Sequence, residues 1–159
     1  MPQMRDGRGD PKEIGILIYP GVQLSAALGL TDIFVFADKL SRERLKQDKP
    51  LLRVSQLAAT GVLARLSDTA PEYAGTPDVI LLPPCLITPA SGAFPDELVA
   101  WLRAEHSAGV TLGSVCGGGF LLAQTGLIQG RSATTNYNLG TLYAERFPDV
   151  VLDMGKMMI

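Results

Sequence analysis

The sequence is poor in the residues that build metal centres, disulfide frameworks and membrane spans. Its 159 residues include one histidine and two cysteines, and no apolar run reaches the roughly 18 residues that a membrane helix needs. One histidine without clustered acids gives little support to a transition-metal site, and two cysteines do not indicate a disulfide framework. No apolar segment of a secretory signal stands near the N-terminus. We therefore expect a cytoplasmic protein with no metal, no cofactor and no membrane contact.

Charge is also scarce and nearly balanced. The chain has 14 basic and 16 acidic residues, a net charge of -2, and 47% hydrophobic content. Such a balance leaves no electrostatic footprint for nucleic acid within this segment. The apolar content is sufficient for one packed domain of ordinary size. We expect a mobile leader over residues 1–12 and one domain over residues 13–159.

Apolar runs and turn residues alternate along the chain in a pattern typical of α/β proteins. The run at 14–19 ends at Pro20 and has the near-continuous apolar character of a strand buried on both faces of a parallel sheet. Helices are expected from Ser25 to about Arg42, over 96–107 and over 138–147, and further strands at 51–58, 62–66, 78–82, 132–134, 150–152 and 156–159. This alternation predicts a doubly wound parallel sheet with helices on both faces, in which ligands bind beyond the carboxyl ends of the strands.

The segment 110–125 carries the strongest functional signal. A short apolar strand ends at Cys116, three glycines follow, and an apolar helix begins. This order predicts a strand-cysteine-helix nucleophile elbow, with Gly117, Gly118 and Gly119 supplying backbone angles that other residues adopt at a cost. The N-terminus of the helix favours the thiolate form of a nearby cysteine. A plain buried cysteine is the alternative, but strand, elbow and helix together favour a functional site.

Several segments resemble the DJ-1/PfpI superfamily, whose class I glutamine amidotransferase-like domain also forms the N-terminal half of many AraC-type transcriptional regulators. The segments are Tyr19-Pro-Gly21, Gly29-Leu-Thr-Asp-Ile-Phe34, Val115-Cys-Gly-Gly-Gly-Phe-Leu-Leu-Ala123, Gly126-Leu-Ile-Gln-Gly-Arg-Ser-Ala-Thr-Thr135 and Glu145-Arg-Phe-Pro-Asp149. The resemblance implies a flavodoxin-like fold, a homodimer and a small-molecule effector. It also implies that DNA is bound only through a C-terminal helix-turn-helix region not present in this chain. Because the family domain continues past this point, it further implies that the domain is truncated at its C-terminus.

The same resemblance shows where this chain departs from its active relatives. They carry an acid at the position of Ala26, a glycine pair whose N–H groups form an oxyanion hole at Pro84 and Cys85, and a histidine at Asn136. Alanine has no carboxylate, proline has no N–H, and asparagine does not transfer protons at neutral pH. A lost general base costs roughly 10²–10⁴ in rate and a lost oxyanion donor about 10²–10³.

Two functions follow from these residues. The first is a ligand-sensing regulatory domain with a pocket around Cys116, Gly117, Pro84, Cys85, Asn136 and Ala26. The second is a cysteine-dependent hydrolase or isonitrile hydratase-like enzyme, in which Cys116 is the nucleophile and an unrecognised acid is the base. A redox sensor at Cys116 is a weaker third possibility.

The remaining chemistry-bearing residues favour structural roles. His106 ends a helix, and Asp32 lies on an apolar helix face where a structural role is preferred to a catalytic one. Cys85 is interpreted as a core residue, with a thiol pair as the alternative. Phe34 and Phe36 on the first helix fit core packing better than a dimer interface.

Overall fold

The computed structural model describes residues 9–59, 63–86 and 94–159, and within them five strands form one sheet. These strands are β1 (Lys12–Ile18), β2 (Leu52–Ala59), β3 (Leu63–Asp68), β4 (Val79–Leu82) and β5 (Thr111–Ser114), in the order β3-β2-β1-β4-β5. All neighbours are parallel except β2 and β3, which are antiparallel. The expected strand over 14–19 is therefore the central strand of the sheet.

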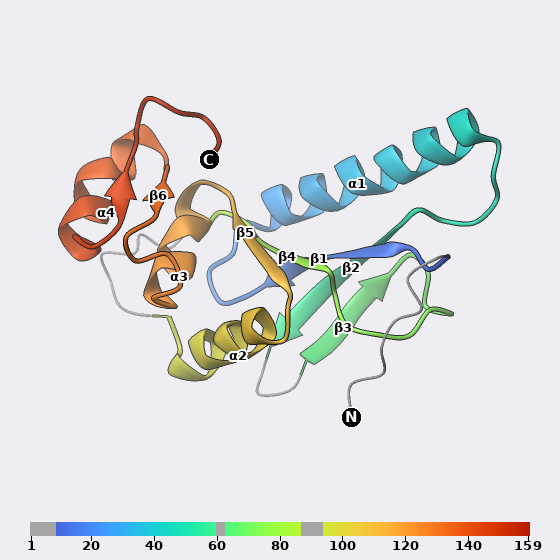
Figure 1. The fold of residues 1–159 in the computed structure, drawn as a ribbon, viewed down its shortest axis with the longest axis horizontal. Coiled ribbons are helices and arrows are strands. Elements are labelled where there is room, and N and C mark those ends of the chain that lie inside the picture. Colours follow the sequence, from blue (N-terminus) through green and yellow to red (C-terminus); the bar gives the residue numbers. More distant parts are fainter. Residues whose placement is uncertain (1–8, 60–62, 87–93) are drawn as a thin grey trace.

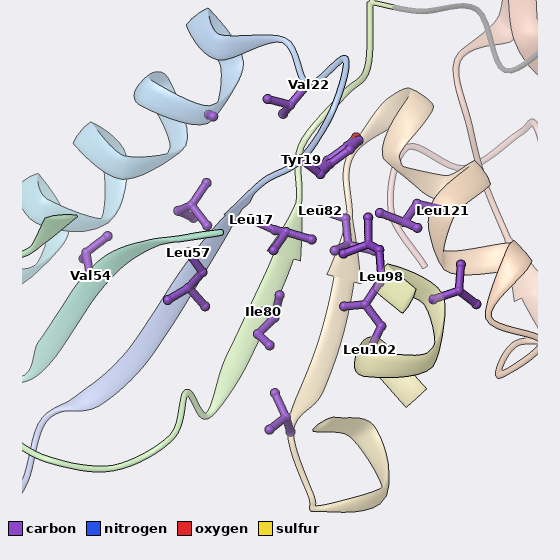
Figure 2. Close-up of a cluster of buried hydrophobic side chains, with 14 residues drawn as sticks. Leu17, Tyr19, Val22, Val54, Leu57, Ile80, Leu82, Leu98, Leu102 and Leu121 are labelled. Carbon is purple, nitrogen blue, oxygen red and sulfur yellow. The ribbon is translucent and has the colours of Figure 1, made fainter. Parts of the chain in front are cut away.

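The core lies on both faces of this sheet. Ile16 and Leu17 of β1 are fully buried although they point to opposite faces, as alternation along a strand requires. Figure 2 shows Leu17, Ile80 and Leu82 beside Leu98 and Leu102 of the helix below them. A strand apolar on both sides is stable here because a helix covers each face.

Helices occupy the two faces of the sheet. The helix α1 (Leu24–Leu45) runs along one face and contacts β1 and β2, while α2 (Asp96–Ser107) lies on the other face near β5 (Figure 1). The helix α3 (Gly119–Gln124) follows β5 and packs beside it. The prediction of an α/β protein with a mainly parallel sheet and helices on both faces is confirmed.

The C-terminal part has a small sheet and a core of its own. Strands β6 (Ser132–Ala133) and β7 (Val151–Leu152) pair with each other in parallel, and α4 (Gly140–Arg146) lies between them in the chain. Phe120, Tyr143 and Phe147 stack edge to face beside them. The strand expected at 156–159 is wrong. These residues have no ladder partner in the described part of the chain, and an apolar run needs a neighbouring strand.

The sequence-based view of α1 needs three corrections. Ser25 does not cap the helix, since Gln23 holds the N-cap position and no side chain caps it. Asp32 is exposed, and the buried carboxylate of the helix is Asp38, which accepts hydrogen bonds from the N–H groups of Leu51 and Leu52 at 2.7 and 2.9 Å. Asp38 thereby joins α1 to the start of β2.

The third correction concerns the apolar side chains of α1. Of the two phenylalanines expected in the core, Phe34 packs against it but Phe36 is exposed, as are Leu28, Ile33 and Leu40. The helix is apolar on nearly all sides, so spacing alone does not identify the face that meets the sheet.

A buried ionic network joins the first three strands. Glu13 is 2% exposed and accepts hydrogen bonds from Arg53 at 3.1 Å, from Arg65 at 3.0 Å and from the Ser55 hydroxyl at 2.6 Å. Arg53 also pairs with Asp68, and this pairing raises the pKa of the guanidinium and lowers the pKa of the carboxyl group. Each buried charge therefore has its partner.

The leader expected over residues 1–12 is described only in part. Residues 1–8 lie outside the described residues, and β1 already begins at Lys12.

Candidate functional site

The candidate site lies at the carboxyl edge of the sheet. Leu82 at the end of β4 pairs with Ser114 at the end of β5, so the segments that follow these strands leave the sheet side by side. The chain passes from β1 to β2 on one side and later returns to β4 on the other. The strand order therefore reverses between β1 and β4, and such a switch point is where open α/β sheets bind ligands.

Cys116 forms a nucleophile elbow, as the sequence predicted. It follows β5, opens the short 3₁₀ turn η2 (Cys116–Gly118) and has a φ of 52°, one of two positive values among the described non-glycine residues. A cysteine in the left-handed region is strained by about 1–2 kcal/mol. Strain of this kind clusters at functional positions.

The three glycines serve a different purpose from the expected one. Gly118 and Gly119 have ordinary helical φ angles of -61° and -58°, and Cys116 itself takes the unusual angle. Glycine is required at 118 by space, because a Cβ there would lie 2.2 Å from the carbonyl oxygen of Leu82. The elbow is therefore pressed against the end of β4.

The segment Pro84-Cys85 lies against both the elbow and the start of α1. The Cys85 thiol donates to the carbonyl of Gly117 at 3.7 Å. The carbonyl of Pro84 accepts from the N–H of Gln23 at 2.7 Å, within the turn that leads to Ala26. Burial raises the pKa of Cys85, and the neighbouring charge of Cys116 adds to the shift. The structure thus brings Cys85 close to the elbow.

Asn136 follows a residue that contacts the elbow, but Asn136 itself is exposed to solvent. Thr135 donates its hydroxyl to the carbonyl of Cys116 at 3.1 Å, which fixes this segment against the elbow. Asn136 is exposed, and its side-chain oxygen accepts from the N–H of Asn138 at 2.9 Å as the cap of the turn η3 (Tyr137–Leu139). The side-chain oxygen of Asn136 therefore binds its own turn and not the Cys116 thiol.

Tyr19 is a site residue that the sequence analysis did not single out for chemistry. It follows β1, is 4% exposed and donates its hydroxyl to the carbonyl of Pro83. Its pKa is raised by burial and by the charges of Cys85 and Cys116, which places the phenol near both thiols. Its position directly after the central strand and before Pro20-Gly21 is the sequence signal that could have identified Tyr19 as a site residue.

Among the described residues, no carboxylate or histidine is placed to move protons to and from the sulfur of Cys116. Over residues 9–59, 63–86 and 94–159, no carboxylate forms a hydrogen bond with the Cys116 thiol, and no three of the His, Cys, Asp and Glu side chains form a group able to hold a metal ion. The segment between Leu86 and Phe94, whose loops were expected to line the pocket, falls mainly outside the described residues.

A cavity of about 420 Å³ lies elsewhere, on the edge strand β5. It is lined by β5, α3, β6 and the C-terminal residues, including Arg131, Tyr143 and Ile159. None of the six predicted pocket residues lines it. The position of the expected ligand pocket therefore remains a prediction drawn from Cys116 and its neighbours.

Several curated proteins resemble this chain in sequence. No protein-family model matches the chain. An uncharacterised protein in the cpoL 5' region of Streptomyces lividans is 28% identical over 151 residues, covering 87% of this chain and 96% of that protein. The HTH-type transcriptional regulator GbdR of Pseudomonas aeruginosa is 26% identical over 152 residues, covering 95% of this chain but 40% of the regulator. The chain thus spans less than half the length of GbdR.

Solved structures give the fold. The AraC family transcriptional regulator from Pseudomonas putida superimposes with a TM-score of 0.66 at 14% identity, covering 91% of this chain and 77% of that one. Drosophila melanogaster DJ-1beta superimposes with a TM-score of 0.56 at 18% identity, covering 94% and 77%. The chain has the fold shared by DJ-1/PfpI proteins and these AraC-family regulators, as the resemblance implied. None of the described helices is long and apolar enough to cross a membrane.

Proposed function

We propose that this chain is the small-molecule-sensing domain of an AraC-type transcriptional regulator. The observation that carries the proposal is the alignment with GbdR, in which nearly the whole chain corresponds to 40% of a longer HTH-type regulator. DNA would then be bound through a C-terminal helix-turn-helix region outside these residues. The balanced charge of the chain agrees with a domain that leaves DNA binding to another part.

The geometry at Cys116 supports sensing better than turnover. Cys116 has the backbone geometry of an elbow and its thiol is partly accessible. The positions at which active relatives are expected to carry a base and an oxyanion donor are occupied by Ala26, Pro84 and Asn136. Tyr19 and Cys85, both with raised pKa, stay protonated at neutral pH and donate to the carbonyls of Pro83 and Gly117, so neither serves as a base for Cys116. A partly accessible thiol with no base beside it among the described residues is better suited to binding a small molecule than to turning it over.

The test is a binding assay with a defined panel of amino acids, amides, nitriles and short carboxylic acids. Calorimetry with the purified chain should show saturable binding of at least one class, and magnetic resonance of the mixture should show no product. Tyr19→Phe should weaken that binding about five- to tenfold, since it removes the hydrogen bond, worth about 1 kcal/mol, that holds the Pro83 carbonyl and the segment after it beside the elbow. Val151→Ala, at an exposed position on β7, is the matched control.

A cysteine-dependent hydrolase or isonitrile hydratase-like enzyme is the second candidate. The strained backbone of Cys116 favours it, because strain at a nucleophile is retained where it serves chemistry. Product formation from an amide, a nitrile or an isonitrile that disappears in Cys116→Ala would establish the enzyme and contradict the sensor. Binding that survives in Cys116→Ala without any product would exclude it.

The sensor is further proposed to work in the cytoplasm and as a homodimer. AraC-family regulators act on DNA, and the domain would share their compartment.

A further inference from the structure

A second cavity of about 420 Å³ lies between α1 and the start of β2, and we call it the amino-edge cavity. The apolar part of its lining consists of Val35 on α1 and of Leu52 and Val54 on β2. Because β2 runs parallel to β1, β4 and β5, its start lies at the amino edge of the sheet, whereas Cys116 lies beyond the carboxyl edge. Figure 1 accordingly shows the end of α1 on the opposite side of the molecule from α3. A volume of about 300–1,000 Å³ is typical of sites that bind small molecules.

Charged side chains of both signs line much of the rest of the amino-edge cavity. They come from α1, from the loop between α1 and β2, and from the loop between β3 and β4, and they are Asp38, Lys39, Arg42, Asp48 and Glu72. Residues that are far apart in the sequence thus meet around one apolar surface. Sites for small polar metabolites combine an apolar lining with a few polar groups in this way.

Asp38 and Arg42 satisfy each other's charges. Nε of Arg42 lies 3.0 Å from a carboxylate oxygen of Asp38. The other carboxylate oxygen of Asp38 accepts from the N–H groups of Leu51 and Leu52. Arg42 also donates to the carbonyl of Asp48 at 2.9 Å. This part of the wall is therefore held in place by the protein itself, and its two charges cancel.

Lys39, Asp48 and Glu72 have no such partners. Within the described residues, none of these three side chains forms an ion pair or a hydrogen bond. All three are exposed, so each can turn toward a bound molecule without losing a contact inside the protein. The amino-edge cavity therefore offers one ammonium group and two carboxylates beside an apolar surface.

We propose that the amino-edge cavity binds a free basic amino acid, such as lysine or ornithine. This ligand carries one carboxylate and two ammonium groups on an aliphatic chain, which is the charge complement of Lys39, Asp48 and Glu72. Its carboxylate pairs with Lys39, and its two ammonium groups pair with Asp48 and Glu72 through charge-assisted hydrogen bonds. Its aliphatic chain lies on Leu52 and Val54. The site is separate from Cys116 and does not depend on the proposed function.

The charge pattern also selects against other amino acids. A neutral amino acid has one ammonium group and leaves one of the two carboxylates of the cavity unpaired. An acidic amino acid leaves the same carboxylate unpaired and brings a second carboxylate of its own. Unpaired or repelling charges of this kind are the basis of discrimination between similar ligands.

Calorimetry with the unmodified chain tests the class of ligand. L-lysine should bind with a dissociation constant below about 1 mM. L-norleucine has the same carbon chain without the side-chain ammonium group, and cadaverine lacks only the carboxylate. Each should bind at least about tenfold more weakly than L-lysine, because each leaves a charged group of the cavity unpaired. The absence of L-lysine binding up to about 10 mM, or equal binding of L-norleucine, overturns the proposal.

Two substitutions test the contacts inside the cavity. Glu72→Gln should weaken L-lysine binding about tenfold, since it removes one of the two carboxylates. Lys39→Met should weaken L-lysine binding by a similar factor but leave cadaverine binding no weaker than before, because cadaverine has no carboxylate. Glu145→Gln, at an exposed position on α4, is the matched control and should change neither. An L-lysine affinity that is unchanged in Glu72→Gln or in Lys39→Met overturns the proposal.

A further variant separates this cavity from the site at Cys116. Tyr19→Phe should leave L-lysine binding unchanged, since Tyr19 follows β1 at the carboxyl edge of the sheet. L-lysine binding that is weakened by Tyr19→Phe and not by Glu72→Gln overturns the proposal and supports the proposed function instead. The two proposals therefore fail separately, because each depends on its own substitution.

Discussion

The Cys116 elbow and the helix α1 both combine glycine with apolar side chains, but the space around the glycine differs between them. At the elbow, Gly118 is pressed against the Leu82 carbonyl, where a Cβ would lie 2.2 Å away. On α1, a Cβ at Gly29 meets open space. The first glycine is needed by the fold of a single chain, while the second leaves room that the fold itself does not use. Glycine is therefore required by a close internal contact in one region and stands beside open space in the other.

The largest expected loss of folding stability comes from a substitution in the elbow. Gly118→Ala should destabilise the chain by about 3 kcal/mol or prevent folding, because the new methyl group meets backbone that has little freedom to move. Urea unfolding followed by circular dichroism measures this change. A loss below about 0.5 kcal/mol would mean that β4 and the elbow separate easily, contrary to their close contact.

A second prediction concerns the folding stability at alkaline pH, through a tyrosine that contacts the helix after the elbow. Tyr143 donates to the carbonyl of Gly119 at 3.4 Å, and burial raises its pKa from 10.0 to about 12. The unfolded chain ionises first, so stability is full below pH 10 and falls as the pH rises toward about 12. The loss should reach about 1–2 kcal/mol.

Unfolding free energies across that pH range check the prediction. Tyr143→Phe should be less stable at neutral pH and should show a flatter decline. An equal slope in both proteins would assign the alkaline loss to other groups.

The third prediction sharpens the contrast between the two glycines. Gly29→Ala should stabilise the folded chain by about 0.5–1 kcal/mol, because alanine favours the helix and meets no neighbour. The same substitution that disrupts position 118 would thus improve position 29. Thermal unfolding measures this effect, and destabilisation would mean that another part of the chain occupies the space beside Gly29.

The smallest expected effect isolates the strain at Cys116. Cys116→Gly should be more stable than Cys116→Ala by about 0.5–1 kcal/mol, since only glycine takes a positive φ without cost. Both variants lack the thiol, so the difference reports the backbone alone. Equal stabilities would show that the turn relaxes once the sulfur is removed.

The regular elements were predictable because their signals are local. The apolar run at the central strand, the turn after it and the cysteine followed by glycines each depend on a few neighbouring residues. The local sequence therefore predicts the elbow correctly at Cys116.

The tertiary contacts were not predictable from the same signals. Asp38 is buried because it binds the N–H groups of Leu51 and Leu52, which lie in another element. The exposure of Phe36 follows from that contact, since fixing Asp38 toward the sheet turns Phe36 outward. The need for Gly118 likewise depends on how close β4 approaches, and no pattern within the elbow reports that distance.

The network around Glu13 has a consequence for how β3 is held at the edge of the sheet. Arg65 of β3 and Arg53 of β2 both reach Glu13 on β1, so the pairing of three strands is fixed by side chains of opposite sign. A slip of one residue in β3 would turn Arg65 to the opposite face and leave Glu13 short of a partner. The network thus specifies the register in which β3 pairs with β2, beyond what the backbone ladder alone would fix.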